Sequence, residues 1–335
     1  MDDIKDLIIL GNGMAGMTAA LYAKRANLDF KIVGRDEYDF GQIGNAILVE
    51  NFPCVDSQSG FDLADKLHDQ LIANDITIEE HEVVEVSRKY TITDTSKPYN
   101  GEQLWEVTYS DDTSDFARTV IYALGASHRQ LECEIEEDAP IHYCALCDGA
   151  LYKDKTVAII GGGDVAFTQA EYLAKICKQV YILMCDTNIT ASPNTVDRIM
   201  KNRIQNPKTK LFNIEIVFNY PVSSISRNID GWVITTDNDC DKTGVLVDGI
   251  FVAIGMIPNT KPLEKYIFDV LDKNRYLDCY DDNLKSVQYT TLFGAGDVRL
   301  KKVRQGITAA SDGAVAVNSV VEELNRYRML RSNNN

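Results

Sequence analysis

A short apolar run that leads directly into closely spaced glycines occurs twice in this sequence. Residues 7–10 run into Gly11-x-Gly13-x-x-Gly16, and residues 157–160 run into Gly161-x-Gly163-x-x-Ala166. Each run is too short for a helix, and helical patterns follow at 17–26 and 167–177. In such a loop the first glycine permits a tight turn, the second lets backbone approach a pyrophosphate, and the third packs helix on strand. The repeat predicts two Rossmann-like dinucleotide-binding folds in one chain.

Two further apolar runs, at 120–125 and 249–255, have the character of closing strands for these two folds. Both end in Ala-x-Gly, and the first does so with Ala123 and Gly125. A third run, at 290–297, ends in Gly296-Asp297 and precedes a helical pattern from about 305 to 328. This last segment is expected to return and complete the first fold.

The order of these signals predicts an α/β protein with one domain inserted in another. The outer domain would consist of residues 1–126 and 253–335, and the inserted domain of residues 127–252. The chain would cross between the domains near Gly125 and Gly255. Two neighbouring crossings of this kind would form a hinge.

Charge and composition exclude several classes of function. The chain has 50 acidic and 34 basic residues and a net charge of −16, which repels nucleic-acid phosphates and anionic lipid. The longest uncharged stretch, 7–23, has glycines in its middle, so we read it as strand, turn and helix rather than a membrane span. The acidic start lacks the positive charge of a secretory signal. We therefore expect a cytoplasmic protein that binds neither nucleic acid nor membrane.

The pair Cys144-x-x-Cys147, followed by Asp148, lies between the first closing strand and the second glycine loop. Two thiols at this spacing can close a disulfide across one helical turn, and a helix N-terminus favours the reactive thiolate. Asp148 could then move the proton. A zinc site would need a second close pair of ligands, which neither the other six cysteines nor the four histidines supply. We predict a redox-active dithiol and no metal.

Taken together and in this order, the motifs resemble those of the low-molecular-weight thioredoxin reductases, and the likeness runs from residue 7 to about 325. The motifs are Gly11-Asn12-Gly13-Met14-Ala15-Gly16, Gly41-Gln42-Ile43, Val49-Glu50-Asn51-Phe52-Pro53, Cys144-Ala145-Leu146-Cys147-Asp148-Gly149, Gly161-Gly162-Gly163-Asp164-Val165-Ala166, Gly296-Asp297-Val298 and Arg304-Gln305.

The resemblance implies one FAD in the split domain, with its pyrophosphate on the first glycine loop and its ribitol chain held by Asp297. It also implies an NAD(P)-like inserted domain that carries the dithiol. The helix near Gln305 would direct its positive end toward the flavin. The cofactor-binding residues expected on this basis are Gly11, Gly13, Ala15, Gly16, Gly34, Arg35, Gln42, Asn51, Ala123, Gly125, Gly296, Asp297, Arg304 and Gln305.

The same resemblance implies that thioredoxin is the protein partner. Cys147 would lie nearest the flavin, Cys144 would attack the partner's disulfide, and Asp148 would serve as acid and base. His142 and His128 receive a structural interpretation, because the family's chemistry needs no histidine. We also expect a homodimer.

The sequence departs from the family at the site that grips NADPH. Members that use NADPH carry a His-Arg-Arg cluster and a further Arg after the second glycine loop, whereas Met184, Cys185, Asp186 and Thr190 stand here. Two or three lost charge-assisted hydrogen bonds cost about 3–9 kcal/mol in total. In the first domain, Gly34 replaces the acidic residue expected for the adenosine ribose, and Arg35 or Asp36 would substitute for it.

This departure favours the ferredoxin-dependent branch of the family, with reduced ferredoxin as electron donor. An acidic ferredoxin would need a basic docking patch on this acidic chain. The candidate patch consists of Arg299, Lys301, Lys302 and Arg304.

Three other functions remain open from the sequence. An NADH-dependent reductase could use Asp186, about 25 residues after Gly161, to bind a ribose 2′-hydroxyl. A flavin dithiol oxidase, which passes electrons from a small dithiol to oxygen, would also need no nicotinamide site. A non-catalytic redox sensor is a further reading, and the intact Cys-x-x-Cys-Asp element argues against it.

Overall fold

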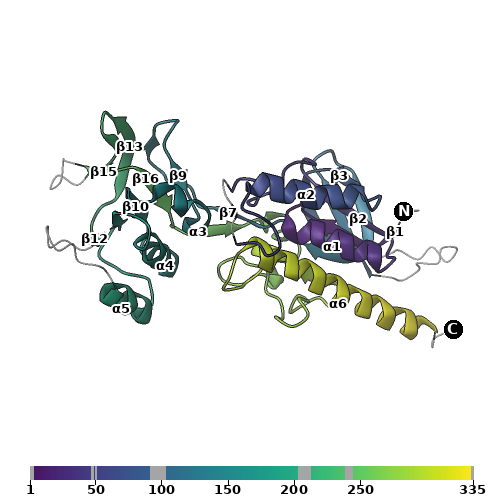
Figure 1. Cartoon of the computed structure of the whole chain (residues 1–335). Helices are drawn as coiled ribbons and strands as arrows, with labels where there is room; N and C mark the ends of the chain where they lie inside the picture. The colour runs from purple at the N-terminus through teal and green to yellow at the C-terminus, as the bar shows by residue number, and fades with distance from the viewer. Residues whose placement is uncertain are drawn as a thin grey trace. The chain divides into compact units, whose positions relative to one another are not determined.

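A computed structural model describes residues 4–46, 49, 51–90, 103–202, 213–237 and 244–332 (Figure 1). The chain divides into two compact units. The first extends up to Ser127 and resumes at Ile257, and the second is His128–Met256. The chain passes between the units through strands β7 (Ala126–His128) and β17 (Met256–Pro258), which pair with each other.

The first unit is built on a seven-stranded sheet in the order β3-β2-β1-β6-β5-β4, with β18 also paired to β6. Strands β1, β2, β3, β6 and β18 run parallel to one another, whereas β5 is antiparallel to both β4 and β6. The strands are β1 (Ile4–Leu10), β2 (Phe30–Gly34), β3 (Ile78–Glu80), β4 (Val83–Tyr90), β5 (Gln103–Tyr109), β6 (Ser114–Tyr122) and β18 (Leu292–Gly294).

Both faces of this sheet are buried. Leu7 and Ile9 of β1 belong to one hydrophobic cluster, whereas Ile8 and Leu10 belong to another. Because successive side chains of a strand point to opposite faces, an uninterrupted apolar run is what such a strand requires. The run at 7–10 that predicted a strand is therefore the centre of the first unit.

Helices α1 (Met14–Arg25), α2 (Gly60–Ile72) and α6 (Gly306–Ser332) accompany this sheet, with short 3₁₀ turns η2 (Lys261–Leu263), η3 (Phe268–Val270) and η4 (Gly296–Val298). Helices α1 and α6 lie side by side in Figure 1. Their backbones approach closely at Gly313, where a Cβ atom would collide with the carbonyl oxygen of Ala15. The C-terminal segment therefore completes the first unit, as the sequence predicts.

The second unit contains a five-stranded parallel sheet in the order β12-β11-β10-β16-β9 and a four-stranded sheet in the order β15-β14-β13-β8. The strands are β8 (Glu134–Ile135), β9 (Ile141–His142), β10 (Thr156–Ile160), β11 (Gln179–Leu183), β12 (Ile214–Val217), β13 (Val222–Asn228), β14 (Gly231–Thr236), β15 (Val245–Val247) and β16 (Gly249–Val252). The helices are α3 (Ala145–Asp148), α4 (Asp164–Leu173) and α5 (Pro193–Asn202), and η1 (Gly149–Tyr152) is a 3₁₀ turn.

Strand β10 repeats the role of β1, since Ile159 faces one cluster while Ala158 and Ile160 face another. Each unit thus has a parallel β-strand, a glycine loop and a helix at its centre. The predicted α/β fold with two Rossmann-like domains is confirmed.

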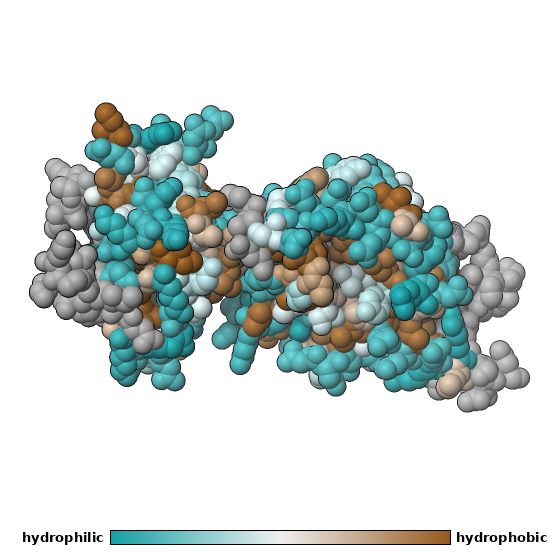
Figure 2. All heavy atoms as spheres, in the orientation of Figure 1, coloured by the Kyte–Doolittle hydropathy of each residue, from teal (hydrophilic) through white to brown (hydrophobic). Residues whose placement is uncertain are grey.

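Hydrophilic residues predominate on the face of the molecule drawn in Figure 2. Among the described helices, none is both long enough and apolar enough to cross a bilayer.

Candidate active site

The first glycine loop joins β1 to α1 in a tight turn. Gly11 has φ +105° and donates its N–H to the Val33 carbonyl at 2.7 Å. A Cβ atom at Gly11 would collide with the Ala123 carbonyl, and one at Gly16 would collide with the Gly11 carbonyl. Gly13 caps α1 in an extended conformation without a side-chain hydrogen bond. Because these glycines have no side chains, a pyrophosphate can approach the N–H groups at the N-terminus of the helix and bind there.

Gly296 and Asp297 lie at the same loop. Gly296 has φ +78°, and a Cβ atom there would lie 3.1 Å from the Ala15 Cβ. Asp297 Oδ1 is buried without a hydrogen-bond partner among the described residues, 3.8 Å from Lys301 Nζ. Burial raises the pKa of Asp297, although Lys301 and Arg304 oppose that shift. An orphaned carboxylate oxygen beside a phosphate-binding loop fits the hydroxyl-bearing ribitol chain of FAD.

Asn51 and Gln305 are brought together although they are far apart in the chain, because Asn51 Nδ2 donates to Gln305 Oε1 at 3.1 Å. Gln305 immediately precedes α6, and its N–H donates to Thr308 Oγ1 at 3.2 Å. The Arg304 guanidinium lies 4.5 Å from the centroid of the Tyr276 ring, and its buried Nε has no hydrogen-bond partner within the described part of the chain. Gln42 Nε2 donates to the Ala126 carbonyl.

The end of β2 is organised by Asn12, a residue that sequence reasoning missed. Asn12 Nδ2 donates to the Asp36 carbonyl at 2.8 Å, and a Cβ atom at Gly34 would lie 2.5 Å from this side chain. Gly34 is therefore required by the space that Asn12 occupies. Arg35 is exposed, and its guanidinium forms an ion pair with Asp39 at 2.6 Å rather than a contact with the glycine loop.

Ala123 and Gly125 follow β6. The Ala123 N–H donates to the Leu10 carbonyl at 2.8 Å, so Ala123 supports the turn at Gly11 from behind. Gly125 has φ +68°, and its carbonyl accepts from the Asn259 N–H at 3.0 Å. A positive φ of this size is the conformation that glycine adopts at little cost.

Cys144 and Cys147 form a disulfide in the second unit, with their Cα atoms 5.3 Å apart. Cys144 is the N-cap of α3, and its Sγ accepts the Cys147 N–H at 3.2 Å. Hydrogen bonding of this kind favours the thiolate over the thiol once the disulfide is reduced. Leu146, between the two cysteines, is exposed.

Asp148 is buried directly after this disulfide and is held by a histidine. Its Oδ2 lies 3.0 Å from His142 Nδ1, and His142 Nε2 lies 2.6 Å from the Tyr152 hydroxyl. Asp148 Oδ1 has no hydrogen-bond partner among the described side chains and backbone groups. The purely structural interpretation of His142 is therefore incomplete, because this residue contacts the carboxylate expected to move protons.

His128 behaves differently from His142. Its ring stacks on Tyr143 with centroids 4.4 Å apart, and burial lowers its pKa. A stacked, partly buried neutral imidazole agrees with the structural interpretation.

The second glycine loop keeps the turn but differs in what surrounds it. Gly161 has φ +145°, and its N–H donates to the Leu183 carbonyl at 3.0 Å. Met184, the first residue after β11, is buried, and its Cε would lie 2.7 Å from a Cβ atom at Gly162. The Gly162 carbonyl accepts the N–H groups of Thr190 and Ala191, each at 3.0 Å. The segment 184–191, which follows β11, is thus held against this loop by packing and by backbone hydrogen bonds.

The basic cluster predicted as a docking patch is largely neutralised. Arg299 is buried and its Nε lies 3.0 Å from Asp312 Oδ2, and Lys301 Nζ lies 2.9 Å from the same oxygen. Only 6% of the Lys301 side chain is exposed. The prediction of a four-residue basic surface is wrong, because Asp312 of α6 pairs with Arg299 and Lys301, and of the four residues only Lys302 is exposed.

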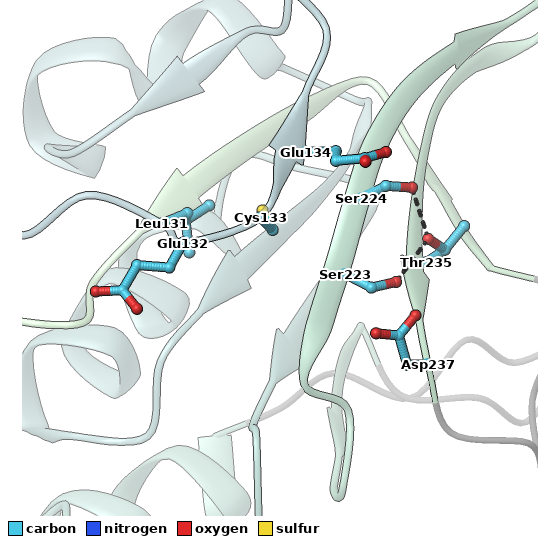
Figure 3. Close-up of a pocket in the computed structure, with 8 residues that line it drawn as sticks. All are labelled: Leu131, Glu132, Cys133, Glu134, Ser223, Ser224, Thr235 and Asp237. Atoms are coloured by element: carbon cyan, nitrogen blue, oxygen red, sulfur yellow. Dashed lines mark hydrogen bonds between the residues drawn. The ribbon is translucent and has the colours of Figure 1, made fainter.

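A cavity of about 770 Å³ lies in the second unit, and none of its lining residues is among those predicted for the site (Figure 3). Thr235 Oγ1 is hydrogen-bonded to Ser223 Oγ at 3.1 Å and to Ser224 Oγ at 2.7 Å. Figure 3 shows Glu134 and Asp237 near these hydroxyl groups. Carboxylates in such a place repel an anionic nucleotide.

The comparisons with known proteins give one family. The model for pyridine nucleotide-disulphide oxidoreductases matches residues 5–314. A thioredoxin reductase of Listeria monocytogenes is 32% identical over 332 residues, 96% of each chain. A 34.2 kDa protein in the rubredoxin operon of Clostridium pasteurianum is 33% identical over 316 residues, 93% of this chain and 94% of its own.

Solved structures agree with this assignment. The thioredoxin reductase of Streptococcus pyogenes aligns with 97% of this chain and 100% of its own, at TM-score 0.79 and 30% identity. The thioredoxin reductase of Giardia duodenalis aligns over the same shares, at TM-score 0.80 and 26% identity. The chain therefore belongs to the pyridine nucleotide-disulphide oxidoreductases, among the low-molecular-weight thioredoxin reductases, and is an FAD-dependent disulfide oxidoreductase.

Proposed function

We propose that this chain reduces the disulfide of a thioredoxin and that its electrons come from reduced ferredoxin rather than from NADPH or NADH. The names of its relatives support thioredoxin as the substrate. One observation carries the choice of donor: the second unit keeps a dinucleotide-type glycine loop, yet Met184, Cys185, Asp186 and Thr190 provide no cation beside it. None of these four positions offers a 2′-phosphate a compensating charge, and Arg198, a cation near Asp164, pairs with Glu171 at 3.0 Å.

NADH is disfavoured by the residue at the end of β11. In nucleotide-binding folds an acidic side chain near this strand end binds the ribose 2′-hydroxyl. Met184 occupies the first position after the strand, and its thioether packs against Gly162. Asp186 lies two residues further on, exposed, and its Oδ1 accepts the Asn188 N–H at 2.7 Å. The carboxylate therefore caps its own turn.

The dithiol chemistry assigns a role to each of three residues. When bound and reduced, FAD would supply the electron pair that cleaves the Cys144–Cys147 disulfide, and two protons complete the two thiols. Cys144 then gives its proton to Asp148, and its thiolate attacks one sulfur of the substrate disulfide. The other substrate sulfur leaves and takes a proton. Cys147 then loses its proton and attacks Cys144 Sγ as a thiolate, which restores the enzyme disulfide; the second substrate sulfur leaves and takes up that proton.

In the outer unit, the glycine loop and Asp297 would hold FAD. The bare backbone at Gly11 and Gly13 would let the pyrophosphate approach the N–H groups at the N-terminus of α1, and the unpartnered Asp297 Oδ1 would accept a ribitol hydroxyl. Asn51, Arg304 and Gln305 would border the flavin at the start of α6. We infer that the outer unit is the FAD domain and that the inserted unit carries the dithiol.

Two glycine substitutions separate FAD binding from folding. Alanine at Gly13 would make only an ordinary contact, 3.5 Å from the Phe40 carbonyl, but its methyl group would stand between backbone and pyrophosphate. Gly13→Ala should therefore fold as apoprotein with a melting temperature lowered by at most a few degrees, because alanine is a poorer N-cap than glycine, and should bind FAD roughly tenfold more weakly or worse. Gly16→Ala, which collides with Gly11, should lower the melting temperature as well. Flavin release and apoprotein melting measure the two effects. Full FAD occupancy in Gly13→Ala at low flavin concentration would contradict the assignment.

Parallel anaerobic reduction of the oxidised holoenzyme tests the donor. Flavin absorbance is followed after mixing with NADPH, NADH, reduced ferredoxin or reduced rubredoxin, each at the same electron equivalents. The last donor is included because one relative is described by its rubredoxin operon. We expect ferredoxin to reduce the flavin within seconds and both nucleotides to fail at millimolar concentration. Fast bleaching by NADPH would overturn the proposal, and bleaching by NADH alone would restore Asp186 as the ribose ligand.

Two further outcomes of that experiment have defined meanings. Rapid oxygen consumption with a small dithiol, without thioredoxin, would make the protein a dithiol oxidase. Failure of every donor, with no disulfide reduction, would leave the redox-sensor reading. Because the chain has a net charge of −16, association with an acidic ferredoxin should accelerate as salt is raised.

A further inference from the structure

His142 makes contacts that connect it with the dithiol. It ends β9, two residues before Cys144, and only 7% of it is exposed. Its Nδ1 lies 3.0 Å from Asp148 Oδ2 and its Nε2 lies 2.6 Å from the Tyr152 hydroxyl, so both ring nitrogens have a buried partner. The Phe251 ring lies 5.2 Å from the imidazole centroid and shields it.

The partners of His142 determine which nitrogen carries the proton. Burial, together with the nearby Asp148 and Asp248, raises the pKa of Tyr152 to about 12, so the phenol keeps its proton at neutral pH. Its O–H can then donate to His142 Nε2. The ring proton therefore belongs on Nδ1, from which it donates to Asp148 Oδ2.

The surroundings contain few other charges. Asp148 and Tyr152 contact the imidazole directly, while Asp248 and Cys177 act on the Tyr152 hydroxyl and Lys155 Nζ lies 5.7 Å from the Tyr152 ring centroid. Phe251 contributes only an apolar face. Among the described residues, His142 Nδ1 is thus the hydrogen-bond donor that holds Asp148 Oδ2.

We propose that His142 is a positioning residue for the proton transfer of this enzyme: with Tyr152 behind it, it holds Asp148 by Oδ2 as a carboxylate, so that Oδ1 alone exchanges a proton with the Cys144 thiol. The proposal rests on the acid–base role given to Asp148 above. The unpartnered state of Oδ1 in the described structure supports it, because that oxygen is available for a proton while the other is not.

The proton balance is closed. Asp148 Oδ1 receives the proton of Cys144 when the thiolate attacks the substrate disulfide, and it returns that proton to the sulfur that leaves. His142 keeps its Nδ1 proton throughout, and Tyr152 keeps its own. Neither residue gains or loses an electron.

The test is the pH dependence of disulfide exchange, measured with a small disulfide so that it does not depend on thioredoxin or ferredoxin. Holoenzyme is reduced anaerobically with dithionite and mixed with excess hydroxyethyl disulfide, and flavin reoxidation is followed from pH 5 to 9. His142→Leu removes the hydrogen bond, His142→Asn keeps an N–H donor near the Nδ1 position, and Tyr152→Phe removes only the hydroxyl.

A buried carboxylate that loses its donor is protonated at a higher pH. In His142→Leu, the pH below which the rate of flavin reoxidation falls (the acid limb) should therefore rise by at least about one unit. At pH values below this limb, the reaction should be about tenfold slower than in the unmodified enzyme. On the plateau at high pH the rate should stay within about threefold of the unmodified enzyme. His142→Asn should restore the limb, and Tyr152→Phe should shift it upward by less than His142→Leu does.

Three results would overturn the proposal. One is a His142→Leu rate lowered by the same factor at every pH, which is what a merely structural role predicts. The second is an unshifted limb in both His142→Leu and Tyr152→Phe. The third is a His142→Asn variant that behaves like His142→Leu. Failure of thioredoxin or ferredoxin in separate assays would count against the proposed function while leaving these results unaffected.

Discussion

Serine in place of Cys144 is expected to abolish thioredoxin reduction and to leave Cys147 as a lone thiolate facing the oxidised flavin. The structure has the two sulfurs in one short helix, with Cys144 at its N-cap and Cys147 three residues on. Because neither thiol alone can complete a disulfide exchange, turnover should fall by roughly a thousandfold or more. A long-wavelength charge-transfer absorbance band in Cys144→Ser is the spectroscopic sign.

Cys147→Ser should lose turnover to the same extent but trap a different species. Its Cys144 thiolate can attack the thioredoxin disulfide, and no second thiol remains to release it. Mass spectrometry should therefore find a mixed disulfide between Cys144 and thioredoxin. Cys54→Ser and Cys185→Ser are matched controls, since both are exposed, unpaired cysteines outside the dithiol, and both variants should keep their activity. A charge-transfer band in Cys147→Ser and trapping by Cys144→Ser would exchange the two roles.

The sequence is sufficient for those parts of the site that short segments build by themselves. A glycine loop between strand and helix depends on contacts within a few residues, so the turn at Gly11 and the close packing at Gly16 follow from the local motif. The dithiol is equally local. Helix starts are less accurate: α1 begins at Met14 and α4 at Asp164, whereas the patterns indicate 17 and 167. The glycines cap both helices one turn before the apolar periodicity becomes visible.

The sequence predicts a contact between distant segments only where both segments belong to motifs of a known family. The Asn51–Gln305 hydrogen bond joins residues that composition and periodicity do not relate. Arg299 and Lys301 show the opposite case, because their closeness in sequence suggests a basic surface. Asp312, on the following helix, forms ion pairs with both side chains and neutralises their charge. Adjacent charges in sequence say little about a surface until their partners in space are known.

The role of His142 escapes sequence reasoning for a related reason. It ends strand β9 six residues before Asp148, which is the last residue of the short helix α3. No periodicity brings two such positions together, since neither the strand repeat nor the helix repeat spans the change of direction. Tyr152 is likewise placed against the imidazole by a 3₁₀ turn that the sequence does not indicate.

Restoring cations beside the second glycine loop should create an NADPH-dependent enzyme. The variant Cys185→Arg/Asp186→Arg/Thr190→Arg changes three exposed side chains, so the substitutions need displace no core residue. Charge-assisted hydrogen bonds are worth about 1.5–3 kcal/mol each, and two or three of them should strengthen NADPH binding by a hundredfold or more. Thr190→Arg gives up a side-chain hydrogen bond to Gly162, but the backbone N–H bond at 3.0 Å remains.

The cause can be isolated with a neutral control and a smaller ligand. Cys185→Gln/Asp186→Asn/Thr190→Gln removes the same repulsive carboxylate and adds comparable side chains without positive charge. If the missing cations are what excludes NADPH, only the arginine variant should distinguish 2′-phospho-AMP from AMP, and its preference should weaken as salt rises. NADH should gain little from the arginines, because it has no 2′-phosphate for them to bind. Equal gains for both nucleotides would show that the Asp186 carboxylate, rather than the missing cations, keeps nucleotides out.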